Sequence, residues 1–396
     1  MIARRHLLAV AAAGVAVPAF AQKMVDLGFP GGPSARPLVT DYPGKGAMVL
    51  QRTTPPLLET PMRVFDGDVL TPNTSHYVRW HWGFPVEVDA AAFRLKVGGH
   101  VGKPLSLSLA ELKKLPRFEI VAVNQCSGNS RGFFEPRVAG AQWGNGAMSN
   151  ARWTGVRLRD VLKAAGVKPG AVQVRFSGLD APAVEAAPDF AKSLAVDHAL
   201  DGEVMIAWAM NGEDLPILNG FPLRLVVPGW FSTYWVKMLD SIEVLSAPDT
   251  GYWMAKAYLV PTAPGANVAP GTREFAREPI NRMPPRSFVT SVADKAVVGW
   301  TPEMKVGGIA FGGDCGVQRV EVSGDGGASW RDARLGTDLG KYGFRRFDGV
   351  VPVARAGAVL MARCTNANGL AQGMVPNWNP GGYARNVVEP VRVRFS

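Results

Sequence analysis

Cys126 is the residue of this chain whose surroundings point most clearly to chemistry. It follows an apolar run at 121–123 and opens a loop of small polar residues that reaches Arg131 five positions later. A neighbouring guanidinium favours the thiolate over the thiol, and a thiolate is a soft ligand that suits a transition metal. The alternative is that Cys126 is a small buried apolar side chain with no chemical role.

The other two cysteines, Cys315 and Cys364, fall in a later part of the chain. They either pair with each other or pack separately, and both possibilities stay open. No C-x-x-C pair or histidine cluster accompanies Cys126, which argues against a structural zinc site. The sequence also contains no C-x-x-C-H motif, so we expect no covalent c-type haem on this chain.

A second group of candidates lies in the segment 76–82, which reads His-Tyr-Val-Arg-Trp-His-Trp. In a strand, Arg79 and His81 point to the same side, and together with Arg131 they would form a pocket for an anion. The alternative is a solvated strand with a surface arginine. Two tryptophans in the same stretch argue against a fully exposed strand.

A third candidate is Arg224, which interrupts an apolar strand predicted over 223–227. Asn-Gly and Pro-Gly pairs bound this segment and predict tight turns on both sides. A cation inside an apolar strand needs a partner of opposite charge. A bound phosphate or a nearby carboxylate would each provide one.

These candidates need a framework, and the sequence predicts an α+β body over residues 61–262. The predicted strands lie at 93–97, 119–124, 172–176 and 223–227. One helix is predicted over 158–165, where Gly166 would end it, and another over 109–115. Residues 23–60 are rich in Pro and Gly, show little periodicity and are interpreted as an extended N-terminal arm.

The pattern changes after residue 262. Pro, Gly, Asn and Arg dominate 260–285 and predict a linker. The later predicted strands, recognised by alternating apolar residues, lie at 317–322, 359–364 and 391–395. A Gly-Asp-Gly-Gly run at 324–327 predicts a tight turn between strands. Together these features predict an immunoglobulin-like β-sandwich over 263–396.

The first 22 residues have the pattern of an export signal. Arg4 and Arg5 precede an uncharged stretch over 7–20, which runs into the small-x-small site Ala19-Phe20-Ala21. The paired arginines favour a twin-arginine-type signal peptide over 1–22, and an ordinary secretory signal is the alternative. We therefore expect an exported, periplasmic protein.

Composition narrows the possible partners. Lys and Arg number 43 against 33 Asp and Glu, for a formal net charge of +10, which suits an anionic substrate or an acidic partner protein. No dense basic tract interleaved with aromatic residues occurs, so we expect no nucleic-acid partner. Beyond the N-terminal signal, no uncharged stretch reaches the length of a membrane span.

In their order along the chain, these segments resemble the sulfite oxidase family of molybdenum enzymes, and most closely its bacterial periplasmic sulfite dehydrogenase branch. The similarity extends from about residue 71 to the C-terminus. It rests on segments at 77–81, 126–131, 143–153, 207–212, 220–229 and 325–330. The resemblance implies a molybdopterin-binding domain at 61–262, followed by a β-sandwich of dimerisation type at 263–396.

The resemblance also implies roles for individual residues. Cys126 matches the thiolate that binds molybdenum together with the pterin dithiolene. The other positions that match cofactor-binding residues are Tyr77, Val78, Arg79, Trp80, His81, Asp180, Asn219, Arg224, Trp235, Val236 and Lys237. The positions that match the substrate pocket or the reactive face are Arg79, Arg131, Trp143 and Tyr258.

The chain departs from the family pattern in two places. Asn219 lies where the vertebrate members have a pterin-binding histidine. No arginine follows the Trp378-Asn379 pair at the vertebrate position of a substrate arginine, and we expect Arg385 to replace it from a shifted position.

The activity that the resemblance implies is oxidation of sulfite to sulfate at a molybdenum–molybdopterin centre. Because we expect no haem on this chain, the electrons are expected to pass to a separate cytochrome c. The assembly is expected to be a homodimer or a heterodimer with a cytochrome subunit. Two alternatives stay open: a sulfane dehydrogenase subunit with the same cofactor, and an exported β-rich binding protein in which Cys126 only packs.

Overall fold

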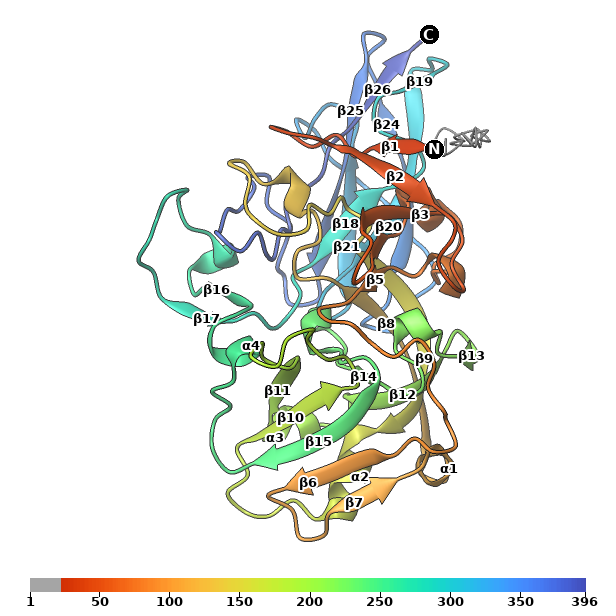
Figure 1. Cartoon of the computed structure of the whole chain (residues 1–396). Coiled ribbons are helices and arrows are strands. Elements are labelled where there is room, and N and C mark those ends of the chain that lie inside the picture. Colours follow the sequence, from red (N-terminus) through yellow and green to blue (C-terminus); the bar gives the residue numbers. More distant parts are fainter. Residues whose placement is uncertain (1–22) are drawn as a thin grey trace, which may run out of the picture.

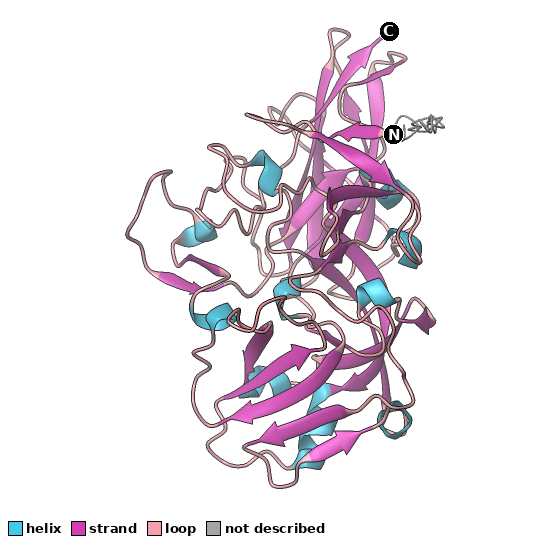
Figure 2. Ribbon diagram, viewed as in Figure 1, coloured by secondary structure: helices cyan, strands magenta, loops and turns pink. Residues whose placement is uncertain are grey.

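The computed structural model describes residues 23–396, so the predicted signal peptide at 1–22 lies outside the described part. The described chain consists mainly of strands, with few and short helices (Figures 1 and 2). The yellow and green middle of the chain forms the lower part of the molecule in Figure 1, and the blue C-terminal part extends to its top. No helix of residues 23–396 is long and apolar enough to cross a membrane.

Five short strands form the first sheet. In order across the sheet they are β1 (Met24–Asp26), β2 (Ala35–Val39), β3 (Met48–Arg52), β4 (Leu57–Glu59) and β5 (Val78–Arg79). The predicted arm at 23–60 thus carries four strands, each antiparallel to the next, whose buried side chains pack with Val78 and Trp80. Strands of three to five residues show little periodicity, so this pairing leaves no clear signal in the sequence.

Two further sheets form the middle of the chain. The first has the order β11 (Ala191–Ala195), β10 (Gln173–Gly178), β15 (Leu239–Leu245), β6 (Leu95–Gly99) and β7 (Leu105–Leu107). The second has the order β13 (Glu213–Asp214), β12 (Met205–Met210), β9 (Met148–Arg157) and β8 (Arg117–Gln125), with β14 (Arg224–Val226) paired to β12. Only β15 and β6 pair in parallel among these strands. The four strands predicted here are confirmed.

Three short α-helices flank these sheets. They are α1 (Leu109–Leu112), α2 (Leu158–Ala165) and α3 (Val196–Leu200). The helix predicted over 158–165 is confirmed, and Gly166 ends it at φ 67°, a conformation that glycine adopts without strain. The helix predicted over 109–115 is shorter than expected, because Leu115 N donates to Leu112 O in a tight turn just before a proline.

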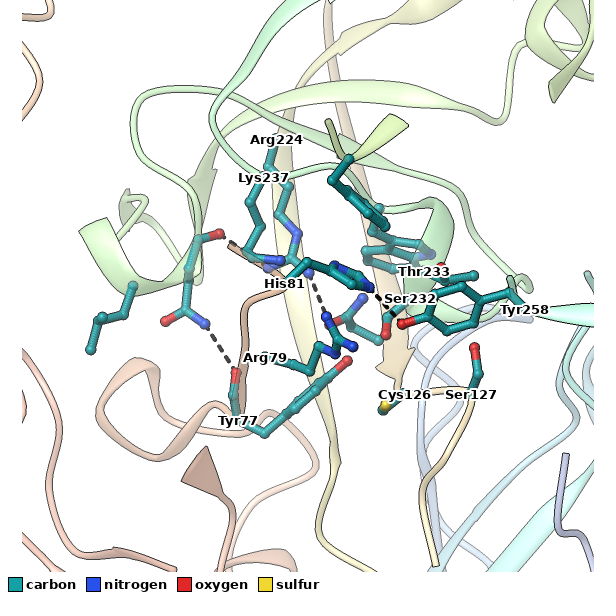
Figure 3. A pocket seen from close by; sticks show the side chains of 15 residues that line it. Tyr77, Arg79, His81, Cys126, Ser127, Arg224, Ser232, Thr233, Lys237 and Tyr258 are labelled. Atoms are coloured by element: carbon teal, nitrogen blue, oxygen red, sulfur yellow. Dashed lines mark hydrogen bonds between the residues drawn. The ribbon is translucent and has the colours of Figure 1, made fainter. Parts of the chain in front are cut away.

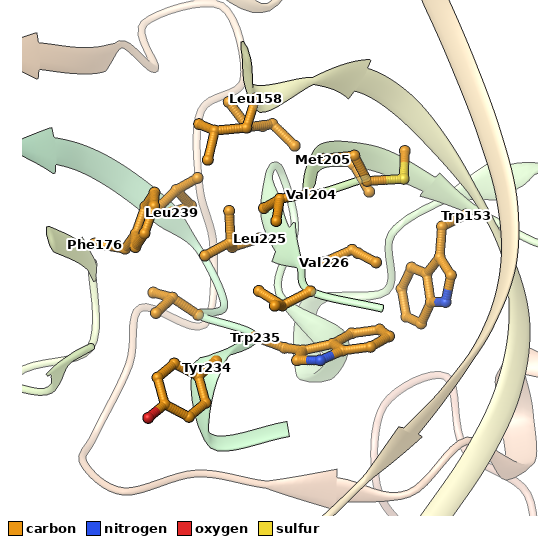
Figure 4. Close-up of a cluster of buried hydrophobic side chains, with 14 of the residues drawn as sticks. Trp153, Leu158, Phe176, Val204, Met205, Leu225, Val226, Tyr234, Trp235 and Leu239 are labelled. Carbon is orange, nitrogen blue, oxygen red and sulfur yellow. The ribbon is translucent and has the colours of Figure 1, made fainter. Parts of the chain in front are cut away.

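Side chains from both middle sheets and from α2 share the largest apolar core (Figure 4). Phe176 of β10, Met205 of β12 and Leu158 of α2 are fully buried in it. The rings of Trp153 and Trp235 meet edge to face there, with centroids 5.5 Å apart. Because β8, β9 and β14 all contribute side chains to this core, packing fixes the ends of these strands and thus the first residues of the loops that follow them.

A segment of irregular structure joins the body to the C-terminal strands. It carries α4 (Tyr252–Ala255) and the antiparallel pair β16 (Leu259–Pro261) and β17 (Arg277–Pro279), so the predicted linker at 260–285 is partly ordered as a hairpin. The short 3₁₀ helices of the described chain are η1 (Met62–Asp66), η2 (Asn73–Ser75), η3 (Arg131–Phe133), η4 (Ile217–Asn219), η5 (Ser232–Tyr234) and η6 (Pro264–Ala266).

Two sheets that share a second apolar core form the C-terminal part. One has the order β18 (Arg286–Val289), β20 (Glu303–Phe311), β24 (Arg345–Pro352) and β23 (Arg334–Leu335). The other has the order β19 (Ala296–Val298), β26 (Val391–Phe395), β25 (Ala358–Asn366), β21 (Val317–Ser323) and β22 (Arg331–Asp332). Phe347 and Leu360 belong to opposite sheets and are both buried in this core. The predicted α+β body followed by a β-sandwich is confirmed.

The cysteines of the sandwich form no disulfide. Cys315 and Cys364 are both free, as is Cys126. The Cys364 thiol donates to the Phe311 carbonyl oxygen at 3.7 Å, and burial raises its pKa to about 12. Cys364 is therefore a packed, protonated side chain.

Candidate active site

A pocket opens beside Cys126, where β5 and the ends of β8 and β14 come together (Figure 3). The space between its lining side chains, counted together with its opening to solvent, is about 440 Å³. The residues that line it are Tyr77, Arg79, His81, Asn124, Cys126, Ser127, Phe190, Leu218, Asn219, Arg224, Ser232, Thr233, Trp235, Lys237 and Tyr258. Most of the residues predicted to bind a cofactor thus meet in one place.

The strand β8 places Cys126 at this pocket. It pairs with β9 along all nine of its residues, and Cys126 follows directly after the last pair. The Cys126 amide donates to the Ala147 carbonyl oxygen at 2.9 Å, so the first residue of the loop is held as firmly as the strand. The thiol lies in a small apolar cluster that includes Trp143 and Tyr77. Trp143 therefore contacts the cysteine's surroundings, although it does not line the pocket.

The charges that line the pocket are all positive. Arg79, Arg224 and Lys237 contribute cations, and no carboxylate occurs among the described lining residues. Burial lowers the pKa of Arg224 to about 10, and burial followed by repulsion from Arg224 lowers the pKa of Lys237 to about 7. Buried cations of this kind, with Lys237 disfavoured further by the charge of Arg224, create a site for an anion.

Asp180 is the acidic residue predicted to bind the cofactor, and it lies next to the lining rather than in it. Burial raises its pKa to about 6, against the opposite effect of Lys237 and Arg79. Asp180 is therefore close enough to these two cations to feel their charge.

Several buried polar atoms of the pocket have no hydrogen-bond partner within residues 23–396. They are Arg79 Nη1, His81 Nδ1, Asn124 Nδ2, Ser127 Oγ, Arg224 Nε and Thr233 Oγ1. Unpaired buried polar groups are rare because each costs free energy, so a cluster of them indicates a polar ligand. Donors, cations and one thiol fit a molybdopterin, with Arg224 and Lys237 suited to its phosphate and Cys126 to its metal.

A metal here would depend on the cofactor for most of its ligands. The described residues contain no group of three or more His, Cys, Asp and Glu side chains that could hold a metal ion. Cys126 is the single soft ligand that the pocket offers. This supports the predicted role of Cys126 as the one protein ligand of a cofactor-bound metal.

Tyr258 and His81 form the polar pair on one wall of the pocket. The Tyr258 hydroxyl lies 2.6 Å from His81 Nε2, and the His81 ring stacks on Phe190 with centroids 3.7 Å apart. Burial and the surrounding cations, Arg79 first among them, hold the pKa of His81 well below its ordinary value. His81 is therefore neutral, and its Nε2 shares one hydrogen bond with the Tyr258 hydroxyl.

Lys192 is a functional candidate that sequence reasoning missed. It is fully buried, its Nζ donates to the Trp253 carbonyl oxygen at 2.7 Å, and it lies 5.6 Å from the centroid of the Tyr258 ring. Burial lowers its pKa to about 7. The sequence does contain a signal for it: Lys192 is the one charged residue in a strand of small and apolar residues, just as Arg224 is in its strand.

Arg131, which was predicted to lie in the substrate pocket, does not line the pocket beside Cys126. Its Nε donates to the Gly381 carbonyl oxygen at 3.2 Å, and its Nη1 donates to the Ala141 carbonyl oxygen at 3.2 Å. The guanidinium lies 5.0 Å from the centroid of the Tyr383 ring, which in turn stacks on Tyr258 at 5.5 Å. Tyr383 was not predicted as a site residue. Its ring lies between Arg131 and Tyr258, which lines the pocket.

The structure does not bring Arg385 to the pocket. Its Nε donates to Glu389 Oε1 at 2.9 Å, and its Nη1 donates to the Phe133 carbonyl oxygen at 3.3 Å. The carboxylate four residues further on binds the guanidinium internally, so Arg385 is not arranged as the replacement for a substrate arginine.

Three of the residues predicted to bind the cofactor lie behind the pocket. Val78 and Trp80 belong to one buried apolar cluster, and Val236 belongs to the main core. Trp80 Nε1 donates to the Leu218 carbonyl oxygen at 3.0 Å, and Lys237 Nζ lies 4.4 Å from the Trp80 ring centroid. These side chains support the lining rather than form it.

Lys45 of the N-terminal sheet supports Asn219, which lines the pocket. Lys45 Nζ donates to Asn219 Oδ1 at 2.6 Å and to the His76 carbonyl oxygen at 2.9 Å. Asn219 Nδ2 in turn donates to the Tyr77 carbonyl oxygen at 3.2 Å. Burial lowers the pKa of Lys45 to about 7. Sequence reasoning missed Lys45 because residues 23–60 were interpreted as an arm.

Glu59 supports the loop that carries Trp143. Its carboxylate is buried and accepts hydrogen bonds from the amides of Gly144 and Gly146, each at 2.9 Å, and from Gln51 Nε2 at 2.8 Å. A Cβ at Gly146 would lie 1.9 Å from the Thr60 carbonyl oxygen, so only glycine permits this approach. Glu59 thereby fixes a loop that contacts the cysteine.

Two domain families match the chain in order. Residues 81–253 match the oxidoreductase molybdopterin binding domain, and residues 277–375 match the Mo-co oxidoreductase dimerisation domain. A solved structure of the sulfane dehydrogenase SoxCD from Paracoccus pantotrophus matches with a TM-score of 0.73, covering 98% of this chain and 93% of that chain. At 24% sequence identity this similarity shows the shared fold.

Proteins of known activity are similar over most of this chain. Mouse mitochondrial sulfite oxidase is 36% identical over 286 residues, 70% of this chain and 51% of that protein. Chicken sulfite oxidase is 35% identical over 88% of this chain and 79% of that protein. Arabidopsis thaliana sulfite oxidase is 31% identical over 72% and 74%, respectively. The chain spans about half the length of the mammalian relatives.

The family prediction made from the sequence is confirmed by these matches. Both domains occur in the expected order, and the pocket with its free thiol lies mostly within the first of them. With the chicken and Arabidopsis relatives covered over most of their length, this chain belongs to the sulfite oxidase family of molybdopterin-binding oxidoreductases.

Proposed function

We propose that this chain is the catalytic subunit of a periplasmic sulfite dehydrogenase, which oxidises sulfite to sulfate and passes the electrons to a separate cytochrome c. The observation that carries the proposal is Arg79 in the pocket beside Cys126, since it is the lining cation that remains for a substrate anion once Arg224 and Lys237 hold the cofactor phosphate, and no carboxylate lines the pocket among the described residues. A small divalent oxyanion such as sulfite suits this field better than a neutral substrate.

The reaction consumes sulfite and water and yields sulfate, two protons and two electrons. Bound at Cys126, a molybdenum–molybdopterin would supply two-electron oxygen-atom transfer. The protein itself would hold the anion, since Arg79 lines the pocket and keeps a buried nitrogen without a partner in the described chain. Preorganised cations stabilise charge in the transition state without rearrangement.

The Tyr258–His81 pair gives the proposed reaction a place for a proton. Burial and the surrounding cations disfavour a protonated His81, so the proton position is the Tyr258 hydroxyl, which lines the pocket and lies 2.6 Å from His81 Nε2. His81 would hold this hydroxyl in place through the hydrogen bond.

The proposed acceptor is a cytochrome c, which would be a separate chain because the given sequence has no C-x-x-C-H motif to bind a c-type haem covalently. The proposed compartment is the periplasm, which the predicted twin-arginine signal supports. A dimerisation domain supports an assembly of two subunits, either two copies of this chain or one copy with a cytochrome.

The test is sulfite-dependent reduction of cytochrome c by protein purified from its native compartment, together with its molybdenum and pterin content. The proposal expects reduction with sulfite and one molybdenum for each chain. Turnover with a protein-bound persulfide but not with sulfite would favour the sulfane dehydrogenase alternative. Purified protein without molybdenum and pterin would favour the binding-protein alternative. Light scattering with and without the cytochrome would give the subunit composition.

A further inference from the structure

A buried ion cluster connects the β-sandwich to the cysteine loop, which we define as residues 126–131. Arg286 of β18 is fully buried, and its Nη1 and Nη2 both donate to Ser130 Oγ at 3.0 Å. Arg286 Nη2 also donates to Glu389 Oε1 at 3.1 Å, and Glu389 accepts from Arg385 as well. Two guanidinium groups thus share one carboxylate directly behind the loop.

Ser130 is the residue of the loop that this cluster holds. Its backbone adopts a left-handed conformation, φ 69° and ψ 18°, which is unfavourable for a residue other than glycine. Its hydroxyl accepts twice from Arg286 and donates to Asn145 Oδ1 at 2.6 Å, so the donor and both lone pairs are used. The turn that separates Cys126 from Arg131 is therefore fixed at its strained residue.

The same cluster reaches the other end of the loop. Arg286 Nη1 lies 3.5 Å from Oε1 of Gln125, the residue that precedes Cys126, and Asn129 Nδ2 donates to the same oxygen at 3.2 Å. Arg385 Nη1 binds the Phe133 carbonyl oxygen, just beyond Arg131. Side chains of the β-sandwich thus contact the chain immediately before and immediately after the loop.

Stability alone does not account for such a cluster. Burying ions costs free energy, and replacing a buried ion cluster by apolar side chains is often neutral or stabilising. Here the cluster carries one positive charge in excess, and burial lowers the pKa of Arg286 to about 10. What the cluster does provide is geometry, since the five N–H donors of a planar guanidinium fix the position of their acceptors.

We propose that Arg286 and Glu389 are positioning residues: from the β-sandwich they hold Ser130 in its left-handed turn and so set the placement of Cys126 and Arg131. Two measurements test this proposal: the alkylation rate of Cys126 and the kinetics of sulfite oxidation. Only the kinetics rest on the proposed function.

The decisive variants are Arg286→Lys, which keeps the charge and loses the fork, and Ser130→Gly, which keeps the left-handed turn and loses the hydroxyl. The full chain is produced in a host without molybdopterin synthesis, and alkylation of Cys126 by iodoacetamide is followed by peptide mass spectrometry. We expect each variant to alkylate roughly tenfold faster than wild type, because charge-assisted hydrogen bonds that close the loop are lost. Arg363→Lys is the control, since Arg363 binds Glu321 within the sandwich.

In the cofactor-loaded enzyme, the same variants should raise the KM for sulfite roughly tenfold and leave kcat within about twofold, as for a misplaced anion ligand. The Arg286→Lys, Ser130→Gly double variant should equal the stronger single variant, because both changes remove the same bond. Additive effects in the double variant, or folded single variants with wild-type alkylation rates, would overturn the proposal.

If Arg286→Lys does not fold, the alkylation rates of Ser130→Gly and Glu389→Gln decide the proposal instead. If wild type does not oxidise sulfite, the proposed function fails while the thiol measurement still decides this inference.

Discussion

The Tyr258 hydroxyl lies 2.6 Å from Nε2 of His81, and the two rings meet edge to face. Removing this hydroxyl leaves a buried ring nitrogen with no partner in the described chain and takes away the proton position that the proposed reaction uses. We expect Tyr258→Phe to lower kcat for sulfite roughly 100-fold, a typical loss for a positioned proton-transfer group. Steady-state kinetics with cytochrome c give the value. Tyr252→Phe, at a ring that is half exposed, is the control, and equal rates in both variants would contradict the role of Tyr258.

Cys126→Ser tests the metal ligand. Serine is close to isosteric with cysteine but is a hard, weak ligand, so we expect molybdenum content to fall to about a tenth of the wild-type value. The fold should persist, because Cys126 lies outside the nine-residue strand that precedes it and that is paired along its length. Elemental analysis and circular dichroism measure the two outcomes. Cys315→Ser is the matched control, and full molybdenum content in Cys126→Ser would refute the assignment.

Lys237 predicts how the stability of the cofactor-free protein depends on pH. Burial and Arg224 lower its pKa from 10.5 to about 7, so between these values the unfolded chain binds a proton that the folded protein has released. The free energy of unfolding therefore rises with pH over this interval. Because Lys237 is partly exposed, we expect wild type to gain only about 1 kcal/mol more than Lys237→Met between pH 7 and pH 9.

Urea titrations at the two pH values measure this difference. Lys45 and Lys192 contribute a similar slope to both proteins, so the comparison isolates Lys237. Lys305→Met, at an exposed lysine of β20, should behave like wild type. A bound anionic cofactor would keep Lys237 protonated, and the slope should then decrease. If wild type and Lys237→Met showed the same pH dependence of the free energy of unfolding in the cofactor-free state, the pKa of Lys237 would not be lowered in the folded protein.

Glu59→Gln tests the support of the loop that carries Trp143. The amide nitrogen of glutamine would face the Gly146 or Gly144 amide, so one hydrogen bond becomes a contact between two donors. We expect a loss of about 2 kcal/mol in the free energy of unfolding, as for an unsatisfied buried donor. Denaturant titration measures it, with the exposed Glu278→Gln as control. A change no larger than that of the control would exclude a supporting role for Glu59.

The sequence predicted the pocket better than its surroundings. Cys126, Arg79 and Arg224 were singled out because a thiol or a cation beside an apolar strand is unusual, and that anomaly is local. The structure brings these side chains into one pocket. A buried site with charges of one sign can thus be recognised in the sequence, because its charged residues stand out beside the apolar strands that lead to it.

The supporting contacts were missed because they are not local. Lys45 binds Asn219 across 174 residues of sequence, and Glu59 binds Gly144 across 85. Neither residue interrupts an apolar run, and the strands around them are too short for their periodicity to be recognised. Arg385 was misplaced for a related reason, since only the structure shows that a carboxylate four residues away binds it.

Arg131 and the Gly381 carbonyl oxygen that it binds are separated by 250 residues. A ribosome that has just delivered the cysteine loop therefore still has more than half of the chain to synthesise before that loop can close. During this time the loop lacks the contacts of Arg131 with Gly381 and of Ser127 with Ala384. Synthesis of residues 381–384 is thus the event that lets the cysteine loop close, and a chain that ends within the β-sandwich would keep the first domain without these two contacts.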